Sequence, residues 1–232
     1  MASFSTTATV AEPEISRDDG RAGLPDYGTR LRRARLGLLV ALTPILMLFV
    51  SFTSAYVVRQ GLPTLDPRTN NLIRDWIPVA LPRLLLLNTF VLLVSSVSME
   101  LARRQLQSQV AHASSSPVAG DTLASRIRMP WLGVTLVLGL AFLFGQWTAW
   151  QQLAADGFYV ATTPSSSFVY LLTGAHAAHL LGGVLALIVA GLASLLHRSL
   201  KTRSIVVDVT AWYWHFMAVL WIYIFCLMKF VR

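Results

Sequence analysis

The stretch VTAWYWHFMAVLWIYIFCLM, residues 209–228, determines the class of this protein. It is an uncharged run of 20 residues, long enough to cross a bilayer as one helix. Its ring N–H and O–H groups need hydrogen-bonding partners away from water. We therefore expect the helix to pack against other protein rather than to face only lipid. The polar aromatic residues of this run are Trp212, Tyr213, Trp214, Trp221 and Tyr223, and it also contains His215.

The composition points to an integral membrane protein. Of the 232 residues, 55% are hydrophobic and 13% are charged, whereas about 25% of residues in soluble domains are charged. The net charge of +8 does not indicate nucleic-acid binding, because the basic residues flank apolar runs instead of forming a stripe. The single cysteine, Cys226, offers neither an intrachain disulfide nor a metal-binding pair.

Charge-free runs predict an all-α fold, a five-helix transmembrane bundle within residues 30–232. Residues 1–29 are polar, mixed in charge and rich in Pro and Gly, and they lack the apolar core of a signal peptide. We expect them to form a disordered cytoplasmic tail. The five helices are expected at about 36–58, 81–101, 129–153, 165–196 and 209–229.

Basic residues at the ends of these helices predict the orientation. One side holds 11 of them and the other side holds 6. Cytoplasmic loops carry the excess of Lys and Arg, so we expect a cytoplasmic N-terminus and an external C-terminus. The richer side comprises Arg30, Arg32, Arg33, Arg35, Arg103, Arg104, Arg126, Arg128, Arg198, Lys201 and Arg203.

Three histidines within the membrane runs are candidates for chemistry. His176 and His179 are three residues apart, which places both rings on one side of a helix. Counted along the helices, His215 lies about 9 Å from one edge of the membrane and His179 about 21 Å from the other edge, so the two have similar depth. Three interpretations stay open: ligation of haem or a metal, a proton relay, and hydrogen-bonded packing inside the bundle.

Asp208 directly precedes the last apolar run. We favour an N-cap role, in which the carboxylate accepts hydrogen bonds from the first free N–H groups of the helix. The functional alternative is a carboxylate near a region of proton entry. Polar and small residues in other helices are expected to serve packing, through hydrogen bonds across helix pairs and close helix approach. Among these are Asn88, Gln146, Gly182 and Gly183.

Several strings together resemble subunit III of the haem–copper oxidases, the cytochrome c and quinol oxidases. The string FVYLLTGAHAAHLLGG (168–183) matches a TG-x-H-x-x-H-x-x-x-G pattern of that family. AWYWHFMAVLWIY (211–223) follows an acidic residue, Asp208, that stands four before Trp212, as in the family. The resemblance covers about residues 35–230 and matches shorter bacterial forms that have five helices instead of seven.

The resemblance implies a non-catalytic accessory subunit of a proton-pumping oxidase in the bacterial cytoplasmic membrane. Such a subunit has no active site, binds no haem, copper or other metal, and holds phospholipid. It packs directly on subunit I, beside subunit II and the other subunits of the respiratory complex, and supports proton uptake during aerobic electron transport. The residues implied in structure, in lipid contact or in the subunit I interface are His176, His179, Asp208, Trp212, Trp214, His215, Trp221, Asn88, Gln146, Gly182 and Gly183.

Other functions remain open from the sequence. The partner complex can be a quinol oxidase or a nitric oxide reductase, since the strings do not distinguish the electron donor or the acceptor. A hypothesis of another class is a self-contained membrane cytochrome, with haem held by His215 and either His176 or His179.

Overall fold

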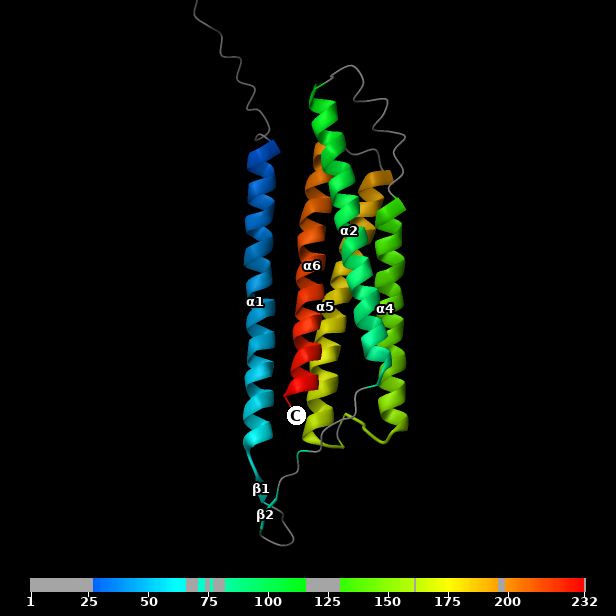
Figure 1. The fold of residues 1–232 in the computed structure, drawn as a ribbon. Coiled ribbons are helices and arrows are strands. Elements are labelled where there is room, and N and C mark those ends of the chain that lie inside the picture. The colour runs from blue at the N-terminus through cyan, green and yellow to red at the C-terminus, as the bar shows by residue number, and fades with distance from the viewer. Residues whose placement is uncertain are drawn as a thin grey trace, which may run out of the picture.

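The computed structural model describes residues 27–65, 71–73, 76, 82–115, 130–160, 162–195 and 199–231. Five long helices run alongside one another: α1 (Tyr27–Gly61), α2 (Leu84–Ser115), α4 (Pro130–Ala155), α5 (Pro164–Leu195) and α6 (Leu200–Phe230) (Figure 1). Each is long and apolar enough to cross a membrane. The all-helical fold with five membrane spans that the sequence predicts is therefore confirmed.

The observed helices differ in length from the charge-free runs. Helix α1 begins at Tyr27 instead of residue 36, α2 continues to Ser115 instead of ending near 101, and α6 begins at Leu200 instead of 209. These extensions carry charged side chains, and the chain stays helical where it continues beyond the apolar run. Charge-free runs locate the apolar part of a helix and miss its polar ends. Of the expected N-terminal tail, residues 1–26 lie outside the described residues.

The helix ends have local causes. Proline is the first residue of both α4 and α5, a position whose missing N–H would be unpaired in any case. Helix α4 ends at Ala155, and the turn that follows contains Gly157, whose φ of +86° glycine adopts without strain. The N–H of Phe158 donates to the carbonyl of Leu153 at 2.9 Å, which satisfies a carbonyl of the last turn.

The short strands β1 (Thr64–Leu65) and β2 (Leu72–Ile73) pair antiparallel beyond the end of α1. They mark what we call the hairpin end of the bundle (Figure 1). Trp76 follows them and contacts the rings of Tyr56 on α1 and Phe168 on α5, with centroids 5.0 and 6.3 Å away. The segment between α1 and α2 is thereby packed onto the bundle at this residue.

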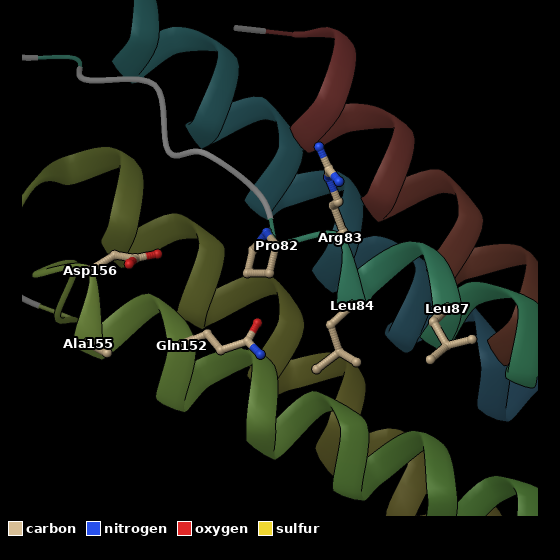
Figure 2. A pocket seen from close by; sticks show the side chains of 7 residues that line it. All are labelled: Pro82, Arg83, Leu84, Leu87, Gln152, Ala155 and Asp156. Atoms are coloured by element: carbon tan, nitrogen blue, oxygen red, sulfur yellow. The ribbon is translucent and has the colours of Figure 1, made fainter.

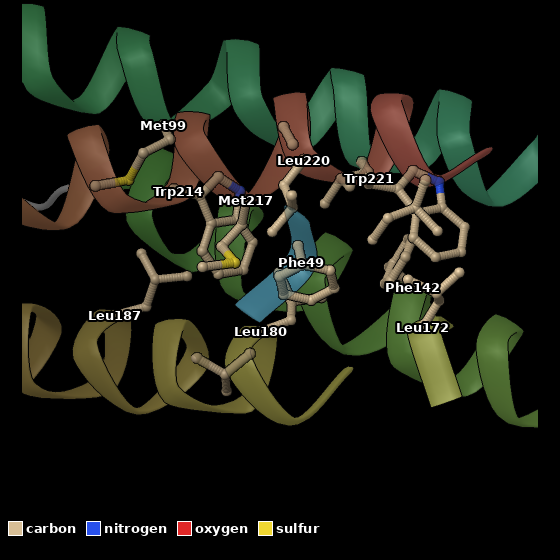
Figure 3. Close-up of a cluster of buried hydrophobic side chains, with 14 of the residues drawn as sticks. Phe49, Met99, Phe142, Leu172, Leu180, Leu187, Trp214, Met217, Leu220 and Trp221 are labelled. Atoms are coloured by element: carbon tan, nitrogen blue, oxygen red, sulfur yellow. The ribbon is translucent and has the colours of Figure 1, made fainter. Parts of the chain in front are cut away.

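Helix α6 is the most buried of the spans and α1 the least. The core contains large side chains from all five helices, with Trp214 and Trp221 of α6 fully buried among them. Figure 3 shows these two rings with Phe49 of α1, Phe142 of α4 and Leu180 of α5. Helix α1 contacts α5 and α6 and lies at the side of the bundle, so few contacts hold it in place.

Candidate functional site

Asp208 lies inside α6, more than two turns from its start, and 1% of it is exposed. The N-cap that the sequence favoured for Asp208 is therefore wrong: the capping position is Ser199. The physical reason is that α6 continues through Lys201 and Arg203, charged residues that end the apolar run without ending the helix. The buried carboxylate must find its partners on other helices.

Arg35 of α1 supplies the main partner of this carboxylate. Its Nε donates to Asp208 Oδ2 at 2.8 Å and its Nη2 donates to Oδ1 at 2.9 Å, a bidentate pair. From α2, Arg103 Nη1 and Gln107 Nε2 donate to Oδ1 at 3.3 and 3.2 Å. One buried carboxylate thus joins three helices at one end of the bundle.

Glu100 of α2 extends this network. Its carboxylate accepts hydrogen bonds from Arg103 at 2.7 and 2.8 Å and from Arg104 at 2.8 Å. The Nε2 of His215 lies 3.4 Å from Glu100 Oε2, and the Nδ1 of His215 lies 2.6 Å from the hydroxyl of Ser96. An Nε2–H tautomer satisfies both contacts, with the Ser96 hydroxyl as donor to Nδ1.

We call this set the charged cluster: Arg35, Glu100, Arg103, Arg104, Asp208 and His215. It lies toward the charged end of the bundle, where α1 and α6 begin and α2 ends (Figure 1). Tyr27 adds a further α1–α6 contact there, since its hydroxyl is 2.9 Å from that of Ser204. The site prediction included Asp208 and His215 but missed the other four members of the cluster.

The three histidines have different surroundings. His176 is fully buried between the rings of Phe142 and Trp221, with centroids 5.9 and 5.1 Å away. His179 donates from Nδ1 to the carbonyl of Ala175 at 2.7 Å, and its ring meets Phe49 of α1 edge-on. His215 belongs to the charged cluster. The contacts of these rings do not pair His215 with either of the others.

The three tryptophans of α6 differ in burial. Trp214 and Trp221 are fully buried, and their N–H groups donate to Ser95 and Thr89 of α2 at 3.1 and 3.0 Å. The expectation that such rings find protein partners is confirmed for both. Trp212 is 49% exposed, and the guanidinium of Arg35 lies 5.9 Å from its ring centre.

Polar and small side chains bring the helices close together. Asn88 of α2 donates to the carbonyl of Phe142 at 3.2 Å, and its amide lies against Gly145, where a Cβ would come within 2.0 Å of Asn88 Oδ1. A Cβ on Gly183 would meet the rings of Tyr213 and Trp214 at 3.1 and 3.2 Å. Gly182 is exposed and a Cβ there would have ordinary contacts, so the close approach depends on Gly183.

A pocket of about 640 Å³ lies at the hairpin end, between the start of α2 and the end of α4 (Figure 2). Leu84, Leu87 and Ala155 form its apolar wall, and the polar residues Gln152 and Asp156 line it from the α4 side. Arg83 lies at its rim. The pocket therefore joins an apolar surface to charged groups at the end of the helices.

Among the described residues there is no group of three or more His, Cys, Asp or Glu side chains placed to hold a metal ion. The ionisable side chains of the charged cluster bind one another. In chemical terms the arrangement can fix the helices α1, α2 and α6 to one another.

The comparisons with known proteins agree with this architecture. The family model described as cytochrome c oxidase subunit III matches residues 28–231. A probable cytochrome c oxidase subunit 3 from Mycobacterium leprae is 30% identical over 102 residues, which are 44% of this chain and 50% of the relative. The corresponding figures for cytochrome c oxidase subunit 3 of Corynebacterium diphtheriae are 32% identity over 102 residues, with the same coverage.

A longer match is with cytochrome c oxidase subunit 3 of Drosophila yakuba, 27% identical over 217 residues, which are 91% of this chain and 74% of that protein. The matched part spans about half the length of the two bacterial relatives. The family model, by contrast, covers the chain from the start of α1 to the end of α6. The chain belongs to the cytochrome c oxidase subunit III family.

Proposed function

We propose that this chain is the non-catalytic subunit III of a haem–copper oxidase of the cytochrome c type. It packs directly on subunit I, beside subunit II, and supports sustained proton uptake during aerobic electron transport. Haem and copper belong to the partner subunits. Family membership supports this proposal, and so do the names of the relatives, which are subunits of cytochrome c oxidase.

The charged cluster is the observation that carries the proposal. The carboxylates of Asp208 and Glu100 are each bound by two arginines within the chain. A group whose lone pairs are filled in this way holds helices together and is poorly placed to bind a substrate. The charged cluster therefore has a structural role, and oxygen reduction takes place in another subunit.

The lateral surface offers room for a partner helix and for lipid. Helix α4 exposes an apolar row with helical spacing: Val137, Leu140, Phe144 and Trp147. Helix α1 exposes a broad apolar face that includes Leu36, Leu39, Val40, Met47 and Val50. Both surfaces suit subunit I or acyl chains. The pocket beside Leu84 and Leu87 has an apolar wall and a charged rim, which suits part of a phospholipid.

The distribution of basic residues supports the orientation in this proposal. The charged end, with Arg35, Arg103 and Arg104, faces the cytoplasm, and the hairpin end faces outward. The charged cluster then lies on the side from which an oxidase takes up protons.

The proposal is tested by comparing the oxidase with and without this chain at equal haem content. Oxygen consumption should start at the same rate in both preparations, because the catalytic centre is intact. The preparation without the chain should lose activity earlier during continuous turnover. An immediate loss of oxygen reduction, with haem and copper still bound, would contradict a non-catalytic role.

A further inference from the structure

The ring nitrogens of His176, Nδ1 and Nε2, are buried without hydrogen-bond partners among the described residues. The whole side chain is fully buried. The Oε1 of Gln146 is likewise buried without a partner in the described part of the chain. Buried polar atoms in native proteins are nearly always paired, with protein or with ordered water.

His176 belongs to α5 and Gln146 to α4, two helices that pack against each other. The ring of Phe142 contacts that of His176, and farther along these two helices Trp150 donates to Thr173 at 3.0 Å. Gln146 is one turn from Phe142 and one turn from Trp150, and therefore lies between these two contacts. The ring of Trp221 on α6 contacts the rings of both Phe142 and His176. Figure 3 shows Trp221 beside Phe142 and Leu172, and Leu172 precedes His176 by one helical turn.

Nearby polar side chains are already bound to other groups. The amide of Asn88 donates to the carbonyl of Phe142. The hydroxyl of Thr173 donates to the carbonyl of Val169 and accepts from Trp150. The Trp221 N–H donates to Thr89. None of these hydrogen bonds includes a His176 nitrogen or Gln146 Oε1, which leaves these atoms to pair with each other or with a further molecule.

Their chemistry defines that molecule. A neutral imidazole offers one N–H donor and one acceptor nitrogen, and an amide oxygen accepts only. Water can donate one O–H to the Gln146 oxygen and use its second O–H or its lone pair for one His176 nitrogen. Buried waters typically bridge about three polar groups of this kind.

We propose that His176 and Gln146 form an internal water site in the α4–α5 seam, closed by Trp221. This site accounts for a polar ring and a polar amide in an otherwise apolar part of the core. The water belongs to the folded chain, so the proposal is independent of the oxidase function and would hold in any complex that contains this subunit.

Water-edited solid-state NMR tests this directly on the full chain in lipid, with ¹⁵N-labelled histidine. Magnetisation should pass from water protons to the His176 ring despite its full burial. A high-resolution cryo-EM map should show a water peak within hydrogen-bond distance of both a His176 nitrogen and Gln146 Oε1. No transfer to this ring, or a direct His176–Gln146 hydrogen bond in the map, would overturn the proposal.

A variant provides the control. In Gln146→Leu the water loses its second partner, so transfer to His176 should fall sharply while transfer to the partly exposed His215 stays unchanged. Undiminished transfer to His176 in this variant would show that Gln146 is not part of the site. Should the variant fail to fold, the wild-type NMR measurement and map still decide between water and a direct contact.

Discussion

Replacing Arg35 with methionine should destabilise the chain more than an ordinary surface substitution does. The variant keeps an aliphatic side chain but removes both hydrogen bonds from Arg35 to Asp208, and Oδ2 then loses the donor that it has among the described residues. Asp208 itself is 1% exposed, so water cannot replace the lost guanidinium without rearrangement. The carboxylate keeps its hydrogen bonds from Arg103 and Gln107 to Oδ1. We expect these two bonds to balance only part of its buried negative charge.

The magnitude follows from the burial of the two partners. Breaking a fully buried ion pair by removing one member costs roughly 3–5 kcal/mol. The Arg35 side chain is 39% exposed, so part of the interaction is screened by solvent. Two other donors also remain on Asp208. We therefore expect Arg35→Met to lower the free energy of unfolding by about 2–3 kcal/mol.

A double-mutant cycle separates the ion pair from the loss of packing. Asp208→Asn removes the charge that Arg35 compensates, so Arg35→Met should cost less in that background, with a coupling of about 1–2 kcal/mol. Arg104→Met is the matched control, because this side chain is 73% exposed and bonds Glu100 alone in the described contacts. It should change stability by no more than about 0.5 kcal/mol.

Equilibrium unfolding in mixed detergent micelles, followed by tryptophan fluorescence, measures these differences. Hydrogen exchange adds a structural readout: the first turns of α1 should exchange faster in Arg35→Met, because α1 has few other contacts. An Arg35→Met variant as stable as Arg104→Met, or strictly additive effects of Arg35→Met and Asp208→Asn, would refute the reasoning.

Three further predictions follow from the contacts. Gly183→Ala should destabilise the α5–α6 packing by about 1–3 kcal/mol because its Cβ has no free space, whereas Gly182→Ala should be neutral or stabilising; equal unfolding midpoints would contradict this. Gly145→Ala should lower the unfolding midpoint unless Asn88 is shortened as well, so rescue by Asn88→Ala in the double variant is the check. Asp208→Asn should reduce the assembly of the oxidase, or its lifetime during turnover, more than its initial rate. Oxygen-electrode traces at equal haem content measure this, and a larger effect on the initial rate would contradict it.

The sequence predicts the spans well because a bilayer imposes a simple rule on composition. The fourth expected helix, 165–196, nearly coincides with α5, since Pro164 starts it and charged residues follow it. The burial of Trp214 and Trp221 could also be anticipated, because their N–H groups cannot remain unpaired in an apolar layer.

The charged cluster could be predicted only in part. The spacing of Glu100, Arg103 and Arg104 by three and four residues indicates local ion pairs on one helix face. Arg35 and Asp208 are 173 residues apart, and no local pattern pairs them. The N-cap prediction for Asp208 failed because helix ends were placed where the apolar run ends, although a polar segment can continue a helix.

Copurification tests the central claim, that this chain serves a redox partner and has no redox centre of its own. The tagged chain, solubilised in mild detergent, should bring down a subunit that contains haem and copper, and the visible spectrum should belong to that subunit. After the partner is dissociated, the chain should be colourless. A haem band that stays with the isolated chain and disappears in His215→Ala, or a chain recovered with no oxidase core, would contradict the account.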